Sequence, residues 1–151
     1  MTVAKTFGWL VLGMAMFASQ VQADLRIEDA WCRATPPGGH AAAIYMRIRN
    51  PGDEAVIITD ISTALGQTML HESSQKSGMA TMRHVDELTV PPMGEVRLQP
   101  RGLHIMLTGL GERLNPGDDF VLEVGSQSQE TQKRNTQTVE VVVRPLTYLS
   151  K

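Results

Sequence analysis

Histidine and methionine residues in the central part of the chain have the types and spacing of ligands for a soft metal ion. His104-Ile105-Met106 lies in a stretch whose alternation predicts a β-strand, with His104 and Met106 on one face and their Cα atoms about 6.5 Å apart. Both side chains can therefore reach a single ion. Upstream, the same two ligand types recur in a stretch with weak strand patterning, as Met69-Leu70-His71 and Met82-Arg83-His84.

The donor atoms of this cluster favour Cu(I) over other biological metals. Thioethers select a soft ion of low charge, and imidazole is an adaptable partner. Zinc would prefer cysteine, histidine and carboxylate, and calcium or magnesium would require oxygen ligands. The carboxylates of the region, Glu72 and Asp86, lie at the edge of the cluster in sequence. Because neutral ligands leave the charge of the ion uncompensated, the cluster suits Cu(I) better than a divalent ion.

The spacing of these residues resembles a known family pattern. His71, ten intervening residues, Met82, twenty-one intervening residues and then His104-x-Met106 resemble the H-x10-M-x21-H-x-M motif of the PCu(A)C family of periplasmic copper chaperones. The segment 30–38, with the sequence AWCRATPPG, is similar to the family's A-W-A-R-A-T-P-P-G stretch. The resemblance covers essentially all of the chain after residue 23, and it implies four copper ligands: His71, Met82, His104 and Met106.

The resemblance also implies a fold and a biological role. The expected fold is an all-β, cupredoxin-like Greek-key barrel or sandwich in a single domain. The expected role is to carry Cu(I) in the periplasm and deliver it to an acceptor protein, such as a cytochrome oxidase subunit with its copper A centre or a Sco-type thiol protein. Cys32 departs from the family pattern, which usually has alanine there, and its role is left open.

The strands that must position the ligands can be predicted from period-two alternation and turn residues. Proline and glycine clusters such as Thr35-Pro36-Pro37-Gly38-Gly39 and Asn115-Pro116-Gly117-Asp118 separate the alternating stretches. No segment shows a sustained helical period, and the polar stretch 125–135 is predicted to be a mobile hairpin loop. The pattern indicates an antiparallel sandwich or barrel, with strands expected at 25–34, 41–49, 55–64, 95–99, 103–107, 119–124 and 138–144.

The first 23 residues have the pattern of a secretory signal peptide. A single charge at Lys5 precedes an apolar run from Phe7 to Ala18, and Val21-Gln22-Ala23 resembles a cleavage site. The apolar run is short for a membrane span, although an uncleaved anchor is the alternative. We expect cleavage after Ala23, export across the cytoplasmic membrane, no membrane span in the mature protein and one copper-binding domain at 24–151.

Composition excludes several classes of function. The 151 residues include 14 Lys plus Arg and 16 Asp plus Glu, for a net charge of −2, so no basic excess is available to bind nucleic acid or anionic lipid. One cysteine excludes an internal disulfide framework and a zinc site with several thiolates. No catalytic triad or carboxylate pair is evident, so the chain is not expected to be an enzyme. We expect it to work as a monomer.

The other histidines and methionines lie outside the motif. Met69 and Met79 border the cluster and remain open as auxiliary ligands. His84 could share a strand face with Met82, but a solvated histidine is the favoured interpretation. His40, beside Gly38-Gly39, is expected in a loop without an assigned role.

Four further residues are expected to be structural. Met46 is predicted in the core, and Met93, within Pro91-Pro92-Met93-Gly94, on an exposed turn. Trp31 is predicted to be a core aromatic residue. Cys32 shares its strand parity with two alanines and is most simply a small packing residue.

Two other functions compete with copper transfer. An electron-transfer cupredoxin would need a thiolate beside two histidines, and Cys32 lies far upstream of the cluster. A metal-free β-sandwich interaction module, in which the histidines and methionines are incidental, is the other alternative. Blue Cu(II) absorption would favour the first, and failure to bind Cu(I) would favour the second.

Overall fold

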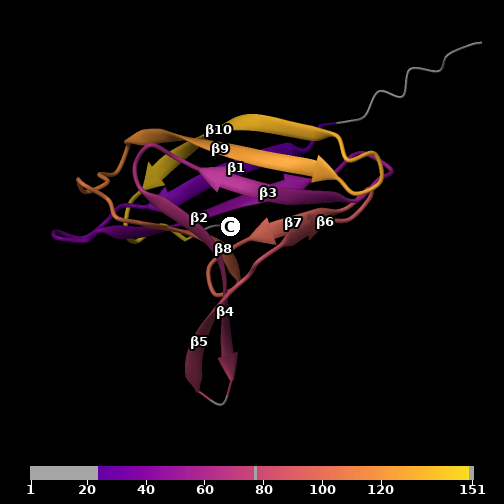
Figure 1. Ribbon diagram of the computed structural model, residues 1–151. Helices are drawn as coiled ribbons and strands as arrows, with labels where there is room; N and C mark the ends of the chain where they lie inside the picture. Colours follow the sequence, from indigo (N-terminus) through magenta and orange to yellow (C-terminus); the bar gives the residue numbers. More distant parts are fainter. Residues whose placement is uncertain (1–23, 77, 150–151) are drawn as a thin grey trace, which may run out of the picture.

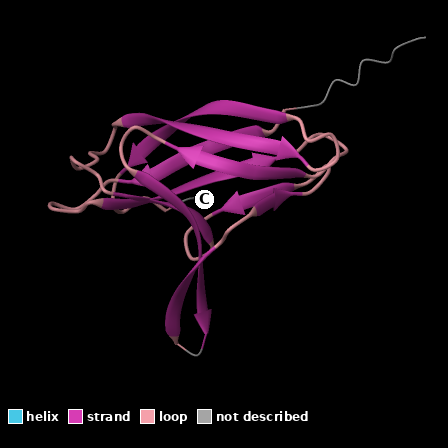
Figure 2. Ribbon diagram, in the orientation of Figure 1, coloured by secondary structure: helices cyan, strands magenta, loops and turns pink. Residues whose placement is uncertain are grey.

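The computed structural model describes residues 24–76 and 78–149, and this part of the chain folds into ten β-strands with no helix (Figure 2). The predicted signal peptide, residues 1–23, lies outside the described residues. No element in the described ranges is a helix long and apolar enough to cross a bilayer. The all-β prediction is confirmed. The strands are β1 (Arg26–Arg33), β2 (Ala41–Arg49), β3 (Val56–Ser62), β4 (Gln67–Lys76), β5 (Met79–His84), β6 (Leu88–Val90), β7 (Glu95–Leu98), β8 (Leu103–Thr108), β9 (Asp119–Ser128) and β10 (Arg134–Arg144).

The strands form one strongly curled sheet in the order β5-β4-β8-β2-β1-β10-β9-β3-β6, with β7 also paired to β2. Among the described strands, β1 and β10 pair in parallel and the other pairs are antiparallel. The β4–β5 hairpin projects from the rest of the sheet (Figure 1). The molecule thus has two regions. The projecting β4–β5 hairpin is called the arm, and the other strands form the body.

The core lies inside the curl, where alternate residues of each strand point inward. Ile44, Ile105, Leu107, Leu122 and Val141 are fully buried there. Burial of such a side chain stabilises the fold by roughly 1.5–3 kcal/mol relative to leaving it exposed. Ile105 and Leu107 therefore hold β8 against the body and direct the intervening side chains to the opposite face of the sheet.

All seven strands expected from alternation are present, within a few residues at most ends, but β4, β5 and β6 were missed. All six residues of β5 are exposed, so no apolar periodicity marks the strand. In β4, Leu70 is buried, whereas Met69 and His71 on the other face are partly accessible. A strand with both faces in contact with water has no hydrophobic alternation to detect.

The predicted loop at 125–135 is wrong in extent. Strands β9 and β10 continue through most of that stretch as paired strands, with Gly125 opposite Thr136 and Gln127 opposite Arg134. Ser126 and Ser128 are buried on the inner face. Polar residues at these inward positions concealed the strands, and the connection between them is limited to residues 129–133.

A β-bulge in β1 changes which face Trp31 occupies. The register with β2 shifts between Glu28 and Trp31, and Asp29 has a φ of 54°. Uninterrupted alternation would place Trp31 with Ile27 on the core face, but the extra residue turns it to the outer face, opposite Tyr45. Trp31 is buried as predicted, and it packs against Tyr45 and Tyr148 outside the main core cluster.

Candidate metal centre

Three histidines from neighbouring strands lie side by side on the outer face of the sheet. In the register of β4, His71 stands opposite His104 of β8 on one side and opposite His84 of β5 on the other. The ring centroids of His71 and His104 are 6.0 Å apart, and those of His71 and His84 are 5.8 Å apart. His71 is therefore the centre of an imidazole row.

Two aromatic residues continue this row into the body. The ring of Tyr45 on β2 lies 6.4 Å from the ring of His104, and the ring of Trp31 on β1 lies 4.7 Å from that of Tyr45. Both aromatic side chains are buried, and Tyr148 packs edge-on against Trp31 at 4.8 Å. The inner end of the row is thus enclosed by aromatic rings, while its outer end reaches the arm.

His104 is held in a defined orientation and tautomer. Its Nδ1 lies 3.0 Å from the carbonyl oxygen of Gly102. A carbonyl can only accept a hydrogen bond, so Nδ1 of the neutral ring carries the proton and Nε2 keeps a free lone pair. A backbone contact of this type is the usual support of a metal-binding imidazole. His104 is 4% exposed, which leaves little freedom for the ring to turn.

His71 carries a buried ring nitrogen that lacks a partner. Nδ1 is inaccessible to solvent, and within 24–76 and 78–149 no group forms a hydrogen bond with it. Buried polar atoms are nearly always paired, so the unpaired Nδ1 of His71 is available to bind a metal ion. Burial, followed by the charges of His104 and His84, lowers the pKa of His71 below its ordinary value of 6.5. The lowered pKa favours the neutral ring that a metal ion requires.

Methionine side chains lie on the same outer face of the sheet as the three histidines. Met106 of β8 stands opposite Met69 of β4, one alternate position along from the pair His71 and His104. Met82 of β5 stands opposite Ser73, which makes it a diagonal neighbour of His71, within reach of a long side chain. The structure thus brings the four predicted ligands to one face of three adjacent strands, and it adds Met69 to that face.

Other candidates are not brought to this face. Met79 lies near the tip of the arm on the opposite face of β5 from Met82 and is 70% exposed. Met46 is buried in the core and Met93 is exposed in a turn with a φ of 50°, both as predicted. His40 Nδ1 lies 2.9 Å from the carbonyl oxygen of Leu110, in the loop before β2.

Carboxylates contribute little to the face. Glu72 points to the opposite side of β4, where it forms an ion pair with Arg83 of β5. Asp86 approaches the face, with Oδ1 3.4 Å from Nε2 of His84. In the described part of the chain, no three His, Cys, Asp or Glu side chains converge as a metal site. The donors that this face presents are therefore mainly imidazoles and thioethers, which are soft or adaptable ligands.

Cys32 lies on the opposite face of the sheet from the histidine row and cannot be a ligand of the same metal ion. It pairs with Ile44 on the core side of the sheet, and its side chain is fully buried in the hydrophobic cluster. Burial raises the pKa of the Cys32 thiol from 9.0 to about 12. The predicted packing role is confirmed, and the thiol is both separated from the histidine row and disfavoured as a thiolate.

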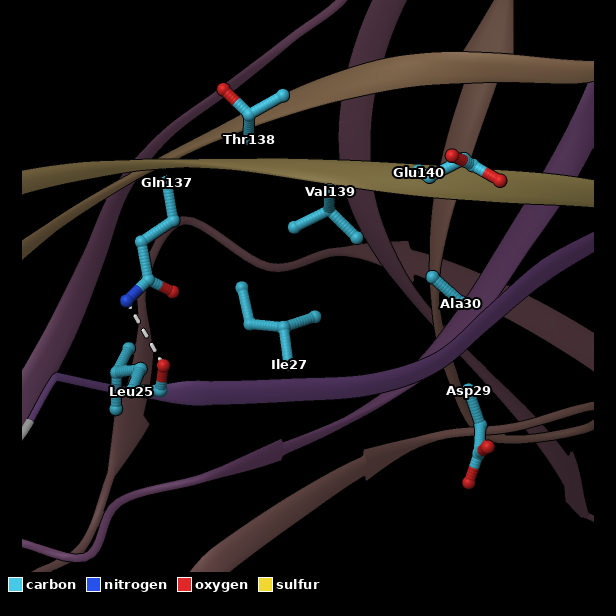
Figure 3. A pocket seen from close by; sticks show the side chains of 8 residues that line it. All are labelled: Leu25, Ile27, Asp29, Ala30, Gln137, Thr138, Val139 and Glu140. Atoms are coloured by element: carbon cyan, nitrogen blue, oxygen red, sulfur yellow. Dashed lines mark hydrogen bonds between the residues drawn. The ribbon is translucent and has the colours of Figure 1, made fainter.

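A separate hollow of about 500 Å³ opens between β1 and β10 (Figure 3). The two strands pair only from Trp31 to Arg33 and separate upstream, where Ile27 and Val139 point into the gap. Gln137 Nε2 donates a hydrogen bond to the carbonyl oxygen of Leu25 across it, at 2.9 Å. Its lining contains neither histidine, cysteine nor methionine, so this hollow is not a candidate for the metal.

The sequence pattern did not predict that His84 and Met69 lie on the ligand face. The parity shared by Met82 and His84 was visible, but without the register nothing indicated that His84 faces His71. The sequence leaves Met69 open as an auxiliary ligand, and its pairing with Met106 places it on the ligand face. Both placements depend on the strands β4 and β5, which alternation did not detect.

A family model matches most of the described chain. It is the LpqE-like model, with the description "Putative lipoprotein LpqE-like", and it covers residues 25–143. A curated relative from Leifsonia xyli subsp. xyli, "Putative lipoprotein Lxx21020", is 33% identical over 99 residues, which cover 64% of this chain and 58% of the relative. The chain therefore matches less than two thirds of that relative's length.

Solved structures share the fold. The solution structure of CuI-DR1885 from Deinococcus radiodurans is 30% identical, with a TM-score of 0.61, and the match covers 86% of this chain and 85% of that one. The copper-bound PCuAC domain from PmoF2 is 20% identical, with a TM-score of 0.65 over 82% of this chain and 94% of that one. These similarities confirm the predicted cupredoxin-like single-domain fold and support the resemblance to PCuAC domains.

Proposed function

Because the chain belongs to the LpqE-like family and is 30% identical to a protein solved with Cu(I), we propose that it is a copper chaperone that binds Cu(I) and passes it to another protein. The proposed ligands are His71, Met82, His104 and Met106. Copper is the cargo of this protein. The hydrophobic core lies on the opposite face of the sheet from these ligands, so we expect the metal-free protein to fold.

The observation that carries the proposal is the unpaired, buried Nδ1 of His71 between two other imidazoles. Thioethers on both flanking strands supply the remaining soft donors, Met106 from β8 and Met82 from β5. With Glu72 turned away and Cys32 in the core, this donor set is neutral. Neutral nitrogen and sulfur donors favour Cu(I) over Cu(II) and over zinc.

The position of the site suits transfer. A carrier must hold its ion against water and release it when an acceptor offers competing ligands. The face extends from buried His104 to the exposed arm, where Met82 is 53% exposed. An acceptor can therefore approach one side of the ion while β8 still holds the other.

We further propose that the protein acts outside the cytoplasmic membrane, in the periplasm, as a monomer. The signal-peptide pattern in residues 1–23 and the lipoprotein description of the family support export. The proposed acceptors are a cytochrome oxidase subunit or a Sco-type protein, which the family resemblance implies. No enzymatic activity is proposed.

Electron transfer is the weaker alternative. A blue copper centre needs a thiolate together with two histidines. Cys32 faces the core, and burial raises its pKa to about 12. Addition of Cu(II) should therefore give no intense blue absorption, and its appearance would favour the electron-transfer function.

The direct test is a Cu(I) titration of the purified protein against a competing chelator, followed by X-ray absorption of the loaded form. We expect one tightly bound equivalent with two nitrogen and two sulfur donors. Absence of stoichiometric binding would favour a metal-free interaction module. A donor count without sulfur would contradict the thioether ligands.

A further inference from the structure

His71 is flanked on both sides by the same pair of donor types. On β8, His104 is followed two residues later by Met106, and on β5, His84 is preceded two residues earlier by Met82. Both strands run antiparallel to β4 and place their histidine directly opposite His71. His71 therefore stands between two imidazole–thioether pairs.

The two flanking imidazoles have nearly the same geometry relative to His71. Their ring centroids lie 5.8 Å and 6.0 Å from that of His71, and the ring planes are inclined by 86° and 84°, for His84 and His104 respectively. An ion bound to His71 can therefore be approached from either side. The ring positions alone therefore do not favour His104 over His84 as the second imidazole ligand.

His104 and His84 differ in solvent exposure and in the contacts that hold their rings in place. His104 is buried and its Nδ1 bonds to Gly102, on a strand paired along both edges. The His84 side chain is 53% exposed, on a strand that lies at the edge of the sheet and pairs with β4. Asp86 lies beside His84 and can orient its ring, as carboxylates do for metal-binding histidines.

We propose that His84 is a copper ligand and that Cu(I) occupies two positions that share His71. The inner position uses the four ligands His71, Met82, His104 and Met106, and the outer position uses His71, His84 and Met82. This inference rests on the proposed function, and it assigns to His84 a role that the four-residue pattern does not contain.

The exchange between the positions is a ligand substitution without redox chemistry. The bond from copper to His84 forms as the bond to His104 breaks, and the bond to His71 persists throughout. Copper remains Cu(I), and no electron is transferred. The bond from copper to Met106 breaks in the same step, and the bond to Met82 persists.

The outer position explains how a partly buried ion can be released. His104 is buried, and the ring of Tyr45 lies 6.4 Å from its ring on the side of β2, so acceptor ligands have no open approach from that side. At the outer position the ion lies beside two exposed side chains of the projecting arm (Figure 1). Acceptor ligands can then bind before the chaperone's ligands dissociate.

The first test measures the rate at which Cu(I)-loaded protein transfers copper to bicinchoninate. His84→Ala should slow transfer by about tenfold, the lower range for loss of a group that supports a metal site. His84→Met should recover most of the rate, because a thioether is also a neutral soft donor. A wild-type rate in His84→Ala would overturn the proposal.

The matched control moves the histidine by one residue. Arg83 lies on the opposite face of β5, where it pairs with Glu72. Arg83→His should transfer at the wild-type rate, and His84→Ala combined with Arg83→His should stay slow. Recovery of the rate in the double variant would show that any exposed histidine suffices and would overturn a defined outer position.

The second test measures equilibrium affinity when the inner position is damaged. His104→Ala should retain weak Cu(I) binding through His71, His84 and Met82, and adding His84→Ala should remove at least another tenfold. Equal residual affinities in the two proteins would overturn the outer position. If the wild type binds no Cu(I), the proposed function and this inference both fail, whereas tight wild-type binding without any effect of His84 removes only the inference.

Discussion

The strands β8 and β5 carry similar donors and stand on either side of β4, yet they differ in burial and in the number of neighbouring strands. β8 is paired along both edges, and Ile105 and Leu107 anchor it in the core. β5 pairs with β4 at the edge of the sheet, and all six of its residues are exposed. One strand holds its ligands in place and the other offers them to the surroundings.

This difference matters for a protein that must both bind and release an ion. Donors fixed by packing lose little conformational entropy when the metal binds, whereas exposed donors must be ordered at that moment. Tight retention therefore depends on β8, and access depends on β5. Exposed edge strands also have low local stability, which favours exchange at the arm.

The largest expected contrast is in folding stability. Ile105→Ala should lower the free energy of unfolding by about 2–5 kcal/mol, since it leaves a cavity under β8. Met79→Ala on β5 should change it by less than about 0.5 kcal/mol, because that side chain is 70% exposed. Urea denaturation of both apo proteins measures the difference. Similar losses would show that the arm is as integral to the fold as β8.

A second contrast concerns equilibrium binding of Cu(I). His104→Ala should reduce the affinity about 100-fold, because it removes a preorganised imidazole. His40→Ala is the matched control and should bind as the wild type does, since His40 lies in a loop with Nδ1 against the Leu110 carbonyl. Competition with a chelator gives both values. An unchanged affinity in His104→Ala would remove this residue from the site.

The thioethers of β5 provide a finer comparison within one strand. Met82→Ala should lower Cu(I) affinity by about tenfold, less than the loss at β8, because Met82 must be ordered on binding. Met79→Ala should leave it unchanged, because Met79 lies on the opposite face. The same competition assay applies. Equal effects of the two substitutions would mean that exposed sulfur, and not strand face, determines binding.

The smallest expected effect is the pH dependence of the apo protein. The pKa of His71 is lowered in the folded state, so the unfolded chain binds the proton more tightly. Stability should therefore fall as the pH decreases below the ordinary value of 6.5 and through the lowered folded pKa. Urea unfolding between pH 7.5 and pH 5 should show a shallower decrease for His71→Gln than for the wild type. An identical decrease would mean that protonation of His71 does not change the free energy of unfolding.

Most strands of the body were predictable because alternating apolar residues and turn residues mark them within the local sequence. Residues 41–49 alternate between core and outer face and form β2 with the expected bounds. Proline and glycine turns separate the strands where expected. The arm was not predictable by the same means, since the hydrophobic burial that imposes alternation is absent from β5.

The bulge at Asp29 shows a second limit of sequence patterns. One additional residue reverses the face of every later side chain in the strand. It turns Trp31 to the outer face, beside Tyr45 in the row of rings that includes His104, and it turns Cys32 into the core. The sequence contains no proline or glycine at this point to mark the shift.

The sequence by itself determined the donor types, their spacing and hence the preference for a soft ion, because ligand softness is a property of side chains alone. Only the tertiary structure decided which donors meet. The register of β4 with its two neighbours places His71 between His104 and His84, and a shift by one residue would separate them onto opposite faces. Such pairing depends on contacts between distant segments, so it became visible only in the folded sheet.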